Sequence, residues 1–259
     1  MRILLTNDDG IHAPGLAVLE AIASVLTAPS DVWVIAPAFE QSGVGHCISY
    51  TRPLMLAEHG PRCFAVEGSP ADCVIAGIGE VMDVRPDLVL SGVNRGNNSA
   101  ENTLYSGTLG AALEGALQGI PSIGLSQYYG PANARASDPF EAARAHGADV
   151  IRGILKAGFE EDADYSLFYN VNFPPVMADD VKGIRAVRQG VREGVHFGAV
   201  SDTSPSGRPF LWIKGGNQHV AVPEDTDAGA NLDGYVSVTP MRADLTAHDA
   251  LTRVAKAFD

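Results

Sequence analysis

The chain has 259 residues, of which 46% are hydrophobic and 19% charged, a composition typical of a compact globular protein and not of a disordered one. Eighteen lysines and arginines stand against 31 aspartates and glutamates, and the resulting net charge of −13 argues against a nucleic acid or an anionic membrane as partner. An anionic substrate would therefore need a local positive charge, such as a bound cation, at its site.

Short apolar runs alternate with amphipathic segments through the first half of the chain, which is the pattern of βαβ units around a parallel sheet. In chain order, the predicted strands cover residues 3–5, 32–36, 48–56, 63–67, 87–91, 121–125 and 167–172. The predicted helices cover residues 14–26, 70–77, 106–117, 139–157 and 246–257, and long loops are expected over 38–47 and 92–105.

Residues 184–240 differ from the first half because they are rich in β-forming residues and turns and show no alternating helices. We therefore predict a doubly wound, mostly parallel, Rossmann-like α/β core over residues 1–175, which carries the functional site. Residues 176–259 are predicted to form a β-rich extension that is closed by the C-terminal helix.

The cysteines and the N-terminal segment indicate a cytoplasmic protein. Cys47, Cys63 and Cys73 are odd in number and lack CxxC spacing, so we expect reduced thiols and neither a disulfide framework nor a zinc knuckle. The apolar run 3–5 is too short for a signal peptide, and no later run approaches the length of a membrane span.

Polar side chains follow three of the predicted buried strands. Asp8 and Asp9 follow the first, Ser42 follows the second, and Asn94 and Asn98 follow the strand at 87–91. Because ligands of an open parallel sheet bind beyond the carboxyl ends of its strands, we expect these side chains to meet at one edge. They offer oxygen donors without a thiol or an imidazole, a set that suits Mg²⁺, Mn²⁺ or Ca²⁺ better than zinc.

An ordinary strand-to-helix turn is the alternative reading of residues 8–10, since Asp and Gly are favoured in turns for local hydrogen bonding alone. Two adjacent carboxylates repel each other, however, and keeping both ionised at a sheet edge is cheap only when a cation lies between them. Ser42 and Asn94, taken singly, would be interpreted as loop residues. Their common position after parallel strands is what favours the metal site.

A second polar motif, Tyr105-Ser106-Gly107-Thr108, opens a predicted helix. Free backbone N–H groups, the positive end of the helix dipole and two hydroxyls would form a phosphate cradle there, while plain N-capping by Ser106 or Thr108 is the alternative. The sequence contains no GxxxxGK[ST] and no GxGxxG after the first strand, which argues against a P-loop enzyme and a dinucleotide enzyme.

Further candidates near the same edge have a weaker basis. His12 and His46 are possible proton shuttles, against the common structural role of a loop histidine. Arg95 is a candidate contact for an anionic substrate, and Asp72 falls in the first turn of a helix, where the dipole alone favours an acid. The predicted ribbon over 202–212 could cover the site.

These motifs together resemble those of one known family. The matching stretches, in family order, are Ile3 to Gly15, Ala36-Pro37 with Gln41 to Gly43, Gly68 to Val74, Ser91 to Asn98, Tyr105 to Thr108, and Gly234 to Ala247. The chain resembles the SurE family of metal-dependent acid phosphatases, also called survival protein E or 5'-nucleotidase SurE. Ser69, where the family usually has Thr, and Ala100, where a Gly is common, depart from the pattern.

The resemblance implies that Asp8, Asp9, Ser42 and Asn94 bind one divalent metal ion, Mg²⁺ or Mn²⁺ or also Ca²⁺. It further implies that Asn98 and the turn Ser106-Gly107-Thr108 lie in the phosphate pocket. The implied substrate is a nucleoside 5'-monophosphate, and some family members also accept 3'-nucleotides or short polyphosphates. Members of the family are homodimers or homotetramers in which C-terminal segments reach a neighbouring subunit, so the extension is expected to serve in oligomerisation.

Our hypothesis is phosphomonoester hydrolysis assisted by one metal ion, with Asp8, Asp9 and Asn98 as catalytic residues. A phosphotransferase with an aspartyl nucleophile would need Asp-x-Asp after the first strand, whereas here the two acids are adjacent. A nucleotide-sensing module without catalysis is the alternative from another class, and it would have no need for the carboxylate pair.

Overall fold

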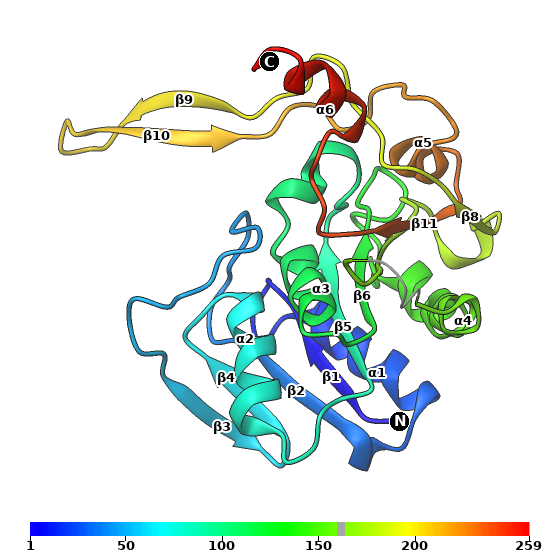
Figure 1. The fold of residues 1–259 in the computed structure, drawn as a ribbon. Coiled ribbons are helices and arrows are strands. Elements are labelled where there is room, and N and C mark those ends of the chain that lie inside the picture. Colours follow the sequence, from blue (N-terminus) through cyan, green and yellow to red (C-terminus); the bar gives the residue numbers. More distant parts are fainter. Residues whose placement is uncertain (160–163, 259) are drawn as a thin grey trace.

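A nine-stranded mixed sheet forms the centre of the molecule, in the strand order β3-β4-β2-β1-β5-β6-β7-β11-β8 (Figure 1). The computed structural model describes residues 1–159 and 164–258. The strands of this sheet are β1 Ile3–Thr6, β2 Val32–Pro37, β3 Leu56–Gly60, β4 Cys63–Val66, β5 Leu88–Arg95, β6 Ser122–Gln127, β7 Phe168–Phe173, β8 Ile184–Ala186 and β11 Val236–Met241. Neighbouring strands are parallel from β4 through β7, and β3 and β11 run antiparallel to β4 and β7.

Helices cover both faces of the sheet. The helices are α1 Pro14–Leu26, α2 Pro70–Ala76, α3 Gly107–Leu117, α4 Glu141–Ala157, α5 Asp227–Leu232 and α6 His248–Ala255. Alternate residues of each buried strand point to opposite faces, so that Ile3 and Leu5 pack in the cluster under α1 and α4, whereas Leu4 packs in the cluster under α2 and α3. This burial on both faces explains why the strands consist of continuous apolar runs.

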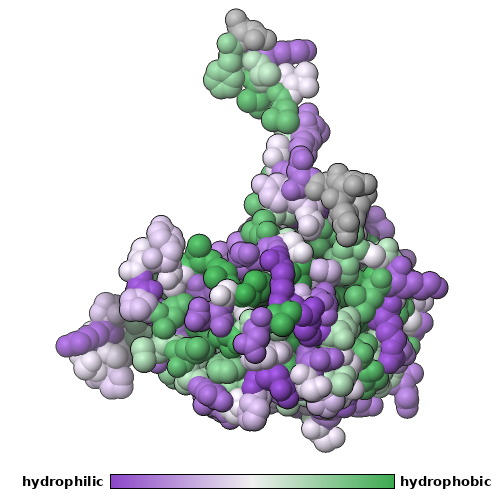
Figure 2. Space-filling model, turned by 60° about the horizontal axis from the view of Figure 1, so that its bottom comes forward, coloured by the Kyte–Doolittle hydropathy of each residue, from purple (hydrophilic) through white to green (hydrophobic). Residues whose placement is uncertain are grey.

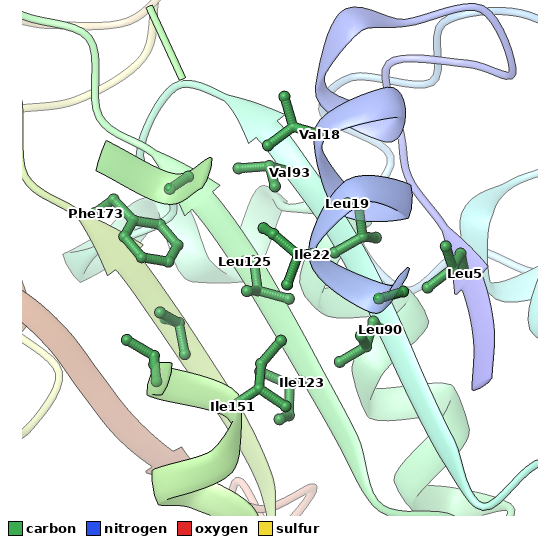
Figure 3. Packing of buried hydrophobic residues seen from close by; sticks show 14 of the residues in the cluster. Leu5, Val18, Leu19, Ile22, Leu90, Val93, Ile123, Leu125, Ile151 and Phe173 are labelled. Atoms are coloured by element: carbon green, nitrogen blue, oxygen red, sulfur yellow. The ribbon is translucent and has the colours of Figure 1, made fainter. Parts of the chain in front are cut away.

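Figure 3 shows the packing of α1 and α4 on the sheet. Leu19 and Ile22 of α1 lie against Leu90 of β5, and Ile151 of α4 lies beside Ile123 of β6. All five side chains are at most 2% exposed. The core therefore holds β1, β5 and β6 in fixed positions relative to one another. The residues at the ends of these strands are positioned in the same way.

The order of the strands reverses beside β1. Along the chain, β1, β2 and β4 follow one another toward one edge of the sheet, and β5, β6 and β7 follow one another toward the other edge. The switch point of the strand order therefore lies between β1 and β5. The predicted doubly wound, mostly parallel sheet is thus confirmed. In this class of fold, the crevice outside the carboxyl ends of the strands at the switch point is the place where ligands bind.

Three sequence predictions of local structure were wrong. The strand expected over 48–56 lies at Leu56–Gly60, because β3 pairs antiparallel with β4 after a stretch interrupted by Pro53. The loop expected from 92 begins later, since β5 continues to Arg95 and residues 100–105 form a 3-10 helix. Helix α5 was not expected, because its 6 residues are too few to produce a periodic pattern.

The segment after residue 175 contributes to two different parts of the molecule. β8 and β11 extend the central sheet, while β9 Gly198–Thr203 and β10 Pro209–Lys214 form a separate hairpin that projects from the body (Figure 1). The division of the chain into a core over 1–175 and an extension over 176–259 stays a prediction. Residues 160–163 and 259 lie outside the described residues. Among the described residues, no helix combines the length and apolarity needed to cross a membrane.

Candidate active site

Five of the predicted site residues line one cavity at the switch point. Asp8 follows β1, Ser42 follows β2, Asn94 lies near the end of β5, and Asn98 and Ser106 belong to the segment between β5 and α3. The cavity that these residues share has a volume of about 670 Å³. The structure thus brings together the ends of three strands and the start of a helix, as their positions in the sequence predicted.

Asp9 faces a second, neighbouring cavity of about 620 Å³. Arg95 lines both cavities, and its backbone N–H donates a hydrogen bond to Oδ2 of Asp9 over 3.0 Å. The side chain of His12 also lines the second cavity. The two adjacent carboxylates therefore lie at the boundary between two cavities, with Asp8 on one side and Asp9 on the other.

Backbone contacts hold the loop after β2 against the turn after β1. Gly10 has a φ of +99°, a conformation that favours glycine, and the Asn7 side-chain amide donates to its carbonyl oxygen over 2.9 Å. The N–H of Gln41 donates to the carbonyl oxygen of Asp8 over 2.7 Å. Because Ser42 follows Gln41 directly, this contact holds Ser42 near Asp8. The hydroxyl of Ser42 donates to Oε1 of Glu40 over 2.9 Å.

Burial makes the ionised forms of both aspartates unfavourable. Asp8 is 3% exposed, and this burial raises its pKa to about 6, although a hydrogen bond from the Thr108 hydroxyl to Oδ1 over 2.6 Å opposes the shift. Burial likewise raises the pKa of Asp9, against the hydrogen bond from the N–H of Arg95. A dication at this point would offset the unfavourable charge.

The donor set fits a hard divalent cation. Among the described residues, no three His, Cys, Asp or Glu side chains group as metal ligands, so the predicted centre has only the carboxylates of Asp8 and Asp9 as charged donors. Ser42 and Asn94 add a hydroxyl and an amide; Nδ2 of Asn94 already donates to the Gly96 carbonyl over 3.0 Å, which leaves Oδ1 as its donor to a cation. Two carboxylates and two neutral oxygens are suitable ligands for Mg²⁺, Mn²⁺ or Ca²⁺.

The start of α3 lies directly against Asp8. A Cβ atom added to Gly107 would meet Cβ of Asp8 at 2.9 Å, closer than real Cβ atoms approach, so only glycine allows this contact. Ser106 caps the helix, since its Oγ accepts from the N–H of Leu109 over 3.1 Å. The N-terminus of an 11-residue helix therefore points its positive end at the site.

Thr108 lies behind Asp8. It is fully buried and does not line the cavity, where the sequence had placed it in the phosphate pocket. Its hydroxyl donates to Asp8 and accepts from Nδ2 of Asn98 over 3.3 Å. Asn98 is fixed further by Ser126 Oγ, which accepts from Nδ2 over 2.8 Å, and by Asn172 Oδ1, which accepts from its N–H over 2.7 Å. Thr108 thus orients Asp8 and Asn98 relative to each other.

Two charged residues that no sequence motif indicated hold the loop between β5 and α3. The side chain of Arg192 is buried and donates to Asn97 Oδ1 over 2.8 Å, to Ser99 O over 3.0 Å and to Glu101 Oε1 over 3.0 Å. Asp227 is fully buried, and its Oδ2 accepts from the N–H of Ala100 over 3.0 Å. These partners lie 91 to 127 positions apart in the chain, so no local pattern could have indicated them.

Two weaker candidates have structural partners. His46 Nε2 lies 2.7 Å from Oε2 of Glu114, so this ring nitrogen is engaged in a hydrogen bond with the helix α3. Asp72 forms a capping box with Ser69 and also accepts from the N–H of Ser49 over 2.8 Å, which ties down the loop after β2. The ribbon expected over 202–212 is part of the hairpin β9–β10. Ile213 of β10 and Phe197, the residue before β9, line the cavity.

Residues 3–195 match the family model described as Survival protein SurE. The chain belongs to the SurE family. The resemblance indicated by the sequence motifs is thereby confirmed.

Relatives that match over nearly the whole chain carry the same name. The "5'-nucleotidase SurE" of Jannaschia sp. (strain CCS1) is 66% identical and covers 100% of both chains, and that of Ruegeria pomeroyi is 67% identical and covers 97% of both. The crystal structure of the SurE protein from Aquifex aeolicus covers 100% of both chains with a TM-score of 0.82 and 36% identity. The fold of this SurE chain, including its C-terminal part, is therefore that of a solved relative.

Proposed function

We propose that this chain hydrolyses the phosphate ester of nucleoside 5'-monophosphates, with one divalent cation held by Asp8, Asp9, Ser42 and Asn94. Support for the reaction comes from family membership and from the name that relatives of 60–67% identity carry, which agrees with the phosphomonoesterase expected from the sequence. The observation that supports the site best is the pair of adjacent carboxylates at the switch point, Asp8 buried and Asp9 partly buried, beside the N-terminus of α3.

The side chains of the site have different roles in the proposed reaction. When bound, a divalent cation draws negative charge off the phosphoryl oxygens and lowers the pKa of the attacking water. Thr108 holds Asp8 in place through its hydroxyl, and Asp8 and Asp9 are the two groups able to orient or deprotonate that water. The start of α3 lies at the same cavity and would stabilise charge on the equatorial oxygens. Asn98 also lines this cavity, but both hydrogens of its Nδ2 are donated to Thr108 and Ser126, so it would reach a phosphoryl oxygen only by exchanging one of these bonds.

Release of inorganic phosphate from AMP tests this proposal. We expect release with added Mn²⁺ or Mg²⁺, none after exhaustive chelation, and most of the rate lost in Asp9→Asn with the fold intact. Asp83→Asn, at an exposed position away from the site, is the matched control and should keep the wild-type rate. Full activity after chelation would reject the metal role, and tight nucleotide binding without phosphate release would favour the sensing module.

The same assay defines the finer substrate range. 3'-AMP and tripolyphosphate belong in the panel, because the cavity of about 670 Å³ is large enough for either. Hydrolysis of AMP at least as fast as of 3'-AMP is the expected result. A preference for the 3'-nucleotide would contradict the proposed 5'-specificity and leave the phosphomonoesterase assignment in place.

We also propose that residues 176–259 join copies of this chain into a homodimer or homotetramer. All residues of β9 and β10 are exposed, and α6 has no buried residue. Hydrophobic side chains lie on the segment that stands away from the body in Figure 2. Leu251 and Val254 of α6 are about half exposed. Sedimentation equilibrium should give at least a dimer, and a monomer at micromolar concentration would contradict this role. A cytoplasmic location stays a prediction.

A further inference from the structure

The cavity that contains Asp8 and Asn94 also has an aromatic wall. Tyr105 precedes the start of α3, and Phe197 comes from the C-terminal segment just before β9, yet the side chains of both line this cavity. Their ring centroids lie 4.8 Å apart with an interplanar angle of 66°, an edge-to-face contact. Two segments that are distant in the sequence therefore build one apolar surface beside the polar site.

Both rings remain partly exposed. Tyr105 is 48% exposed and Phe197 is 46% exposed, although each already contacts the other. An exposed aromatic face in a cavity with phosphate-binding groups is the arrangement on which a planar heterocyclic base stacks. The cation and the start of α3 account for the phosphate, and this wall lies in the same cavity beside them.

A fixed amide completes the wall. Gln218 lines the same cavity, and its Oε1 accepts from Nδ2 of Asn97 over 2.6 Å, while its backbone oxygen accepts from the hydroxyl of Tyr128 over 2.8 Å. With Oε1 engaged, Nε2 is the polar atom that Gln218 can offer to a ligand. A ring nitrogen or carbonyl oxygen of a base would accept a hydrogen bond from it.

The neighbouring cavity offers aromatic side chains as well, including Tyr129 and Phe140, but it contains neither Ser106 nor Asn98. A base bound there would have to place its phosphate on the far side of Asp9. The cavity that combines the phosphate groups with the aromatic wall is therefore the better site for the whole nucleotide.

We propose that Tyr105 and Phe197 form the nucleobase subsite, with Gln218 donating a hydrogen bond to the base. This inference rests on the proposed function, because it names the part of the same cavity that binds the nucleoside. Through Phe197, the C-terminal segment takes part in substrate recognition. It also follows that the rate advantage of a nucleotide over a sugar phosphate without a base depends on this aromatic pair.

The test compares AMP with ribose 5-phosphate, which carries the same phosphate ester and lacks the base. The measured quantity is the ratio of kcat/KM for AMP to kcat/KM for ribose 5-phosphate. Loss of one stacking partner in Phe197→Ala should lower this ratio about tenfold, mainly through KM for AMP. Phe197→Trp keeps a stacking face and should retain the wild-type ratio, which separates stacking from a merely structural role.

The matched control lies on the hairpin itself. Phe210 forms an aromatic pair with Trp212, at a ring-centroid distance of 5.6 Å, and does not line the cavity, so Phe210→Ala should leave the ratio unchanged. A ratio unaffected by both Phe197→Ala and Tyr105→Leu would overturn the subsite, as would a fall caused by Tyr129→Leu instead. Failure of the wild type to release phosphate from either compound would refute the proposed function itself.

Discussion

Removal of the guanidinium of Arg192 should destabilise the protein and disorganise the loop beside the site. The side chain is buried and donates four hydrogen bonds, two of them to Ser99 and one each to Asn97 and Glu101. In Arg192→Met, an apolar side chain of similar volume replaces the arginine and donates no hydrogen bond. The variant thus tests the polar network and not the volume of the core.

The magnitude follows from the burial of each partner. Loss of one member of a buried ion pair costs about 3–5 kcal/mol. The side chain of Glu101 is 28% exposed, so water can solvate its carboxylate in the variant, and the lower end of that range applies. A loss of about 3 kcal/mol lowers the midpoint of thermal unfolding by about 6–12 °C in a protein of this size.

The assay is equilibrium unfolding in urea and by heat at one fixed protein concentration, since association would shift both transitions. Arg188→Met is the matched control: Arg188 pairs with Asp225, but their side chains are 58% and 67% exposed, and the midpoint should hardly change. A loss of less than about 1 kcal/mol in Arg192→Met would refute our account of how the loop is held.

Three further predictions concern single contacts near the site. Thr108→Val removes the hydrogen bond to Asp8 and should weaken Mn²⁺ binding about tenfold by isothermal titration calorimetry, whereas Thr108→Ser keeps the hydroxyl and should retain the wild-type affinity. Equal Mn²⁺ affinities of the wild type and Thr108→Val would contradict the positioning role. Gly107→Ala forces a Cβ to within 2.9 Å of Asp8 Cβ and should cost about 1–3 kcal/mol in urea unfolding as well as most of the activity; a wild-type unfolding curve would contradict the close approach. The hydrogen bond from His46 holds the pKa of Glu114 below its ordinary value of 4.5. The free energy of unfolding lost in Glu114→Gln should therefore be largest above pH 4.5 and should shrink as the pH falls below it. A loss of stability that is independent of pH would exclude this pair as its source.

The central sheet and the grouping of the candidate site residues that follow its strands could be predicted because both depend on local patterns. Continuous apolar runs mark strands buried on both faces, as the alternate packing of Leu4 and Leu5 illustrates. Parallel strands bring their carboxyl ends to one edge, so residues just after them, such as Asp8 and Asn94, meet in space. The topology alone is enough to collect these oxygens.

The remaining features depend on contacts between distant segments. Nothing local distinguishes Thr108 as a residue behind Asp8 from a residue in the phosphate pocket, because the difference lies in how the start of α3 packs against the turn after β1. The contacts of Arg192 and Asp227 with the loop between β5 and α3 join parts of the chain more than 90 residues apart. That Asp8 lines one cavity and Asp9 the neighbouring one likewise depends on the packing of distant segments around these two residues.

The position of a bound cation tests the central claim most directly. Crystals soaked in Mn²⁺ and measured at a wavelength where manganese scatters anomalously should show one peak per chain within about 2.6 Å of oxygens from Asp8, Asp9, Ser42 and Asn94. A strong peak elsewhere on the chain, or none at this point from a protein that is active with Mn²⁺, would contradict the account.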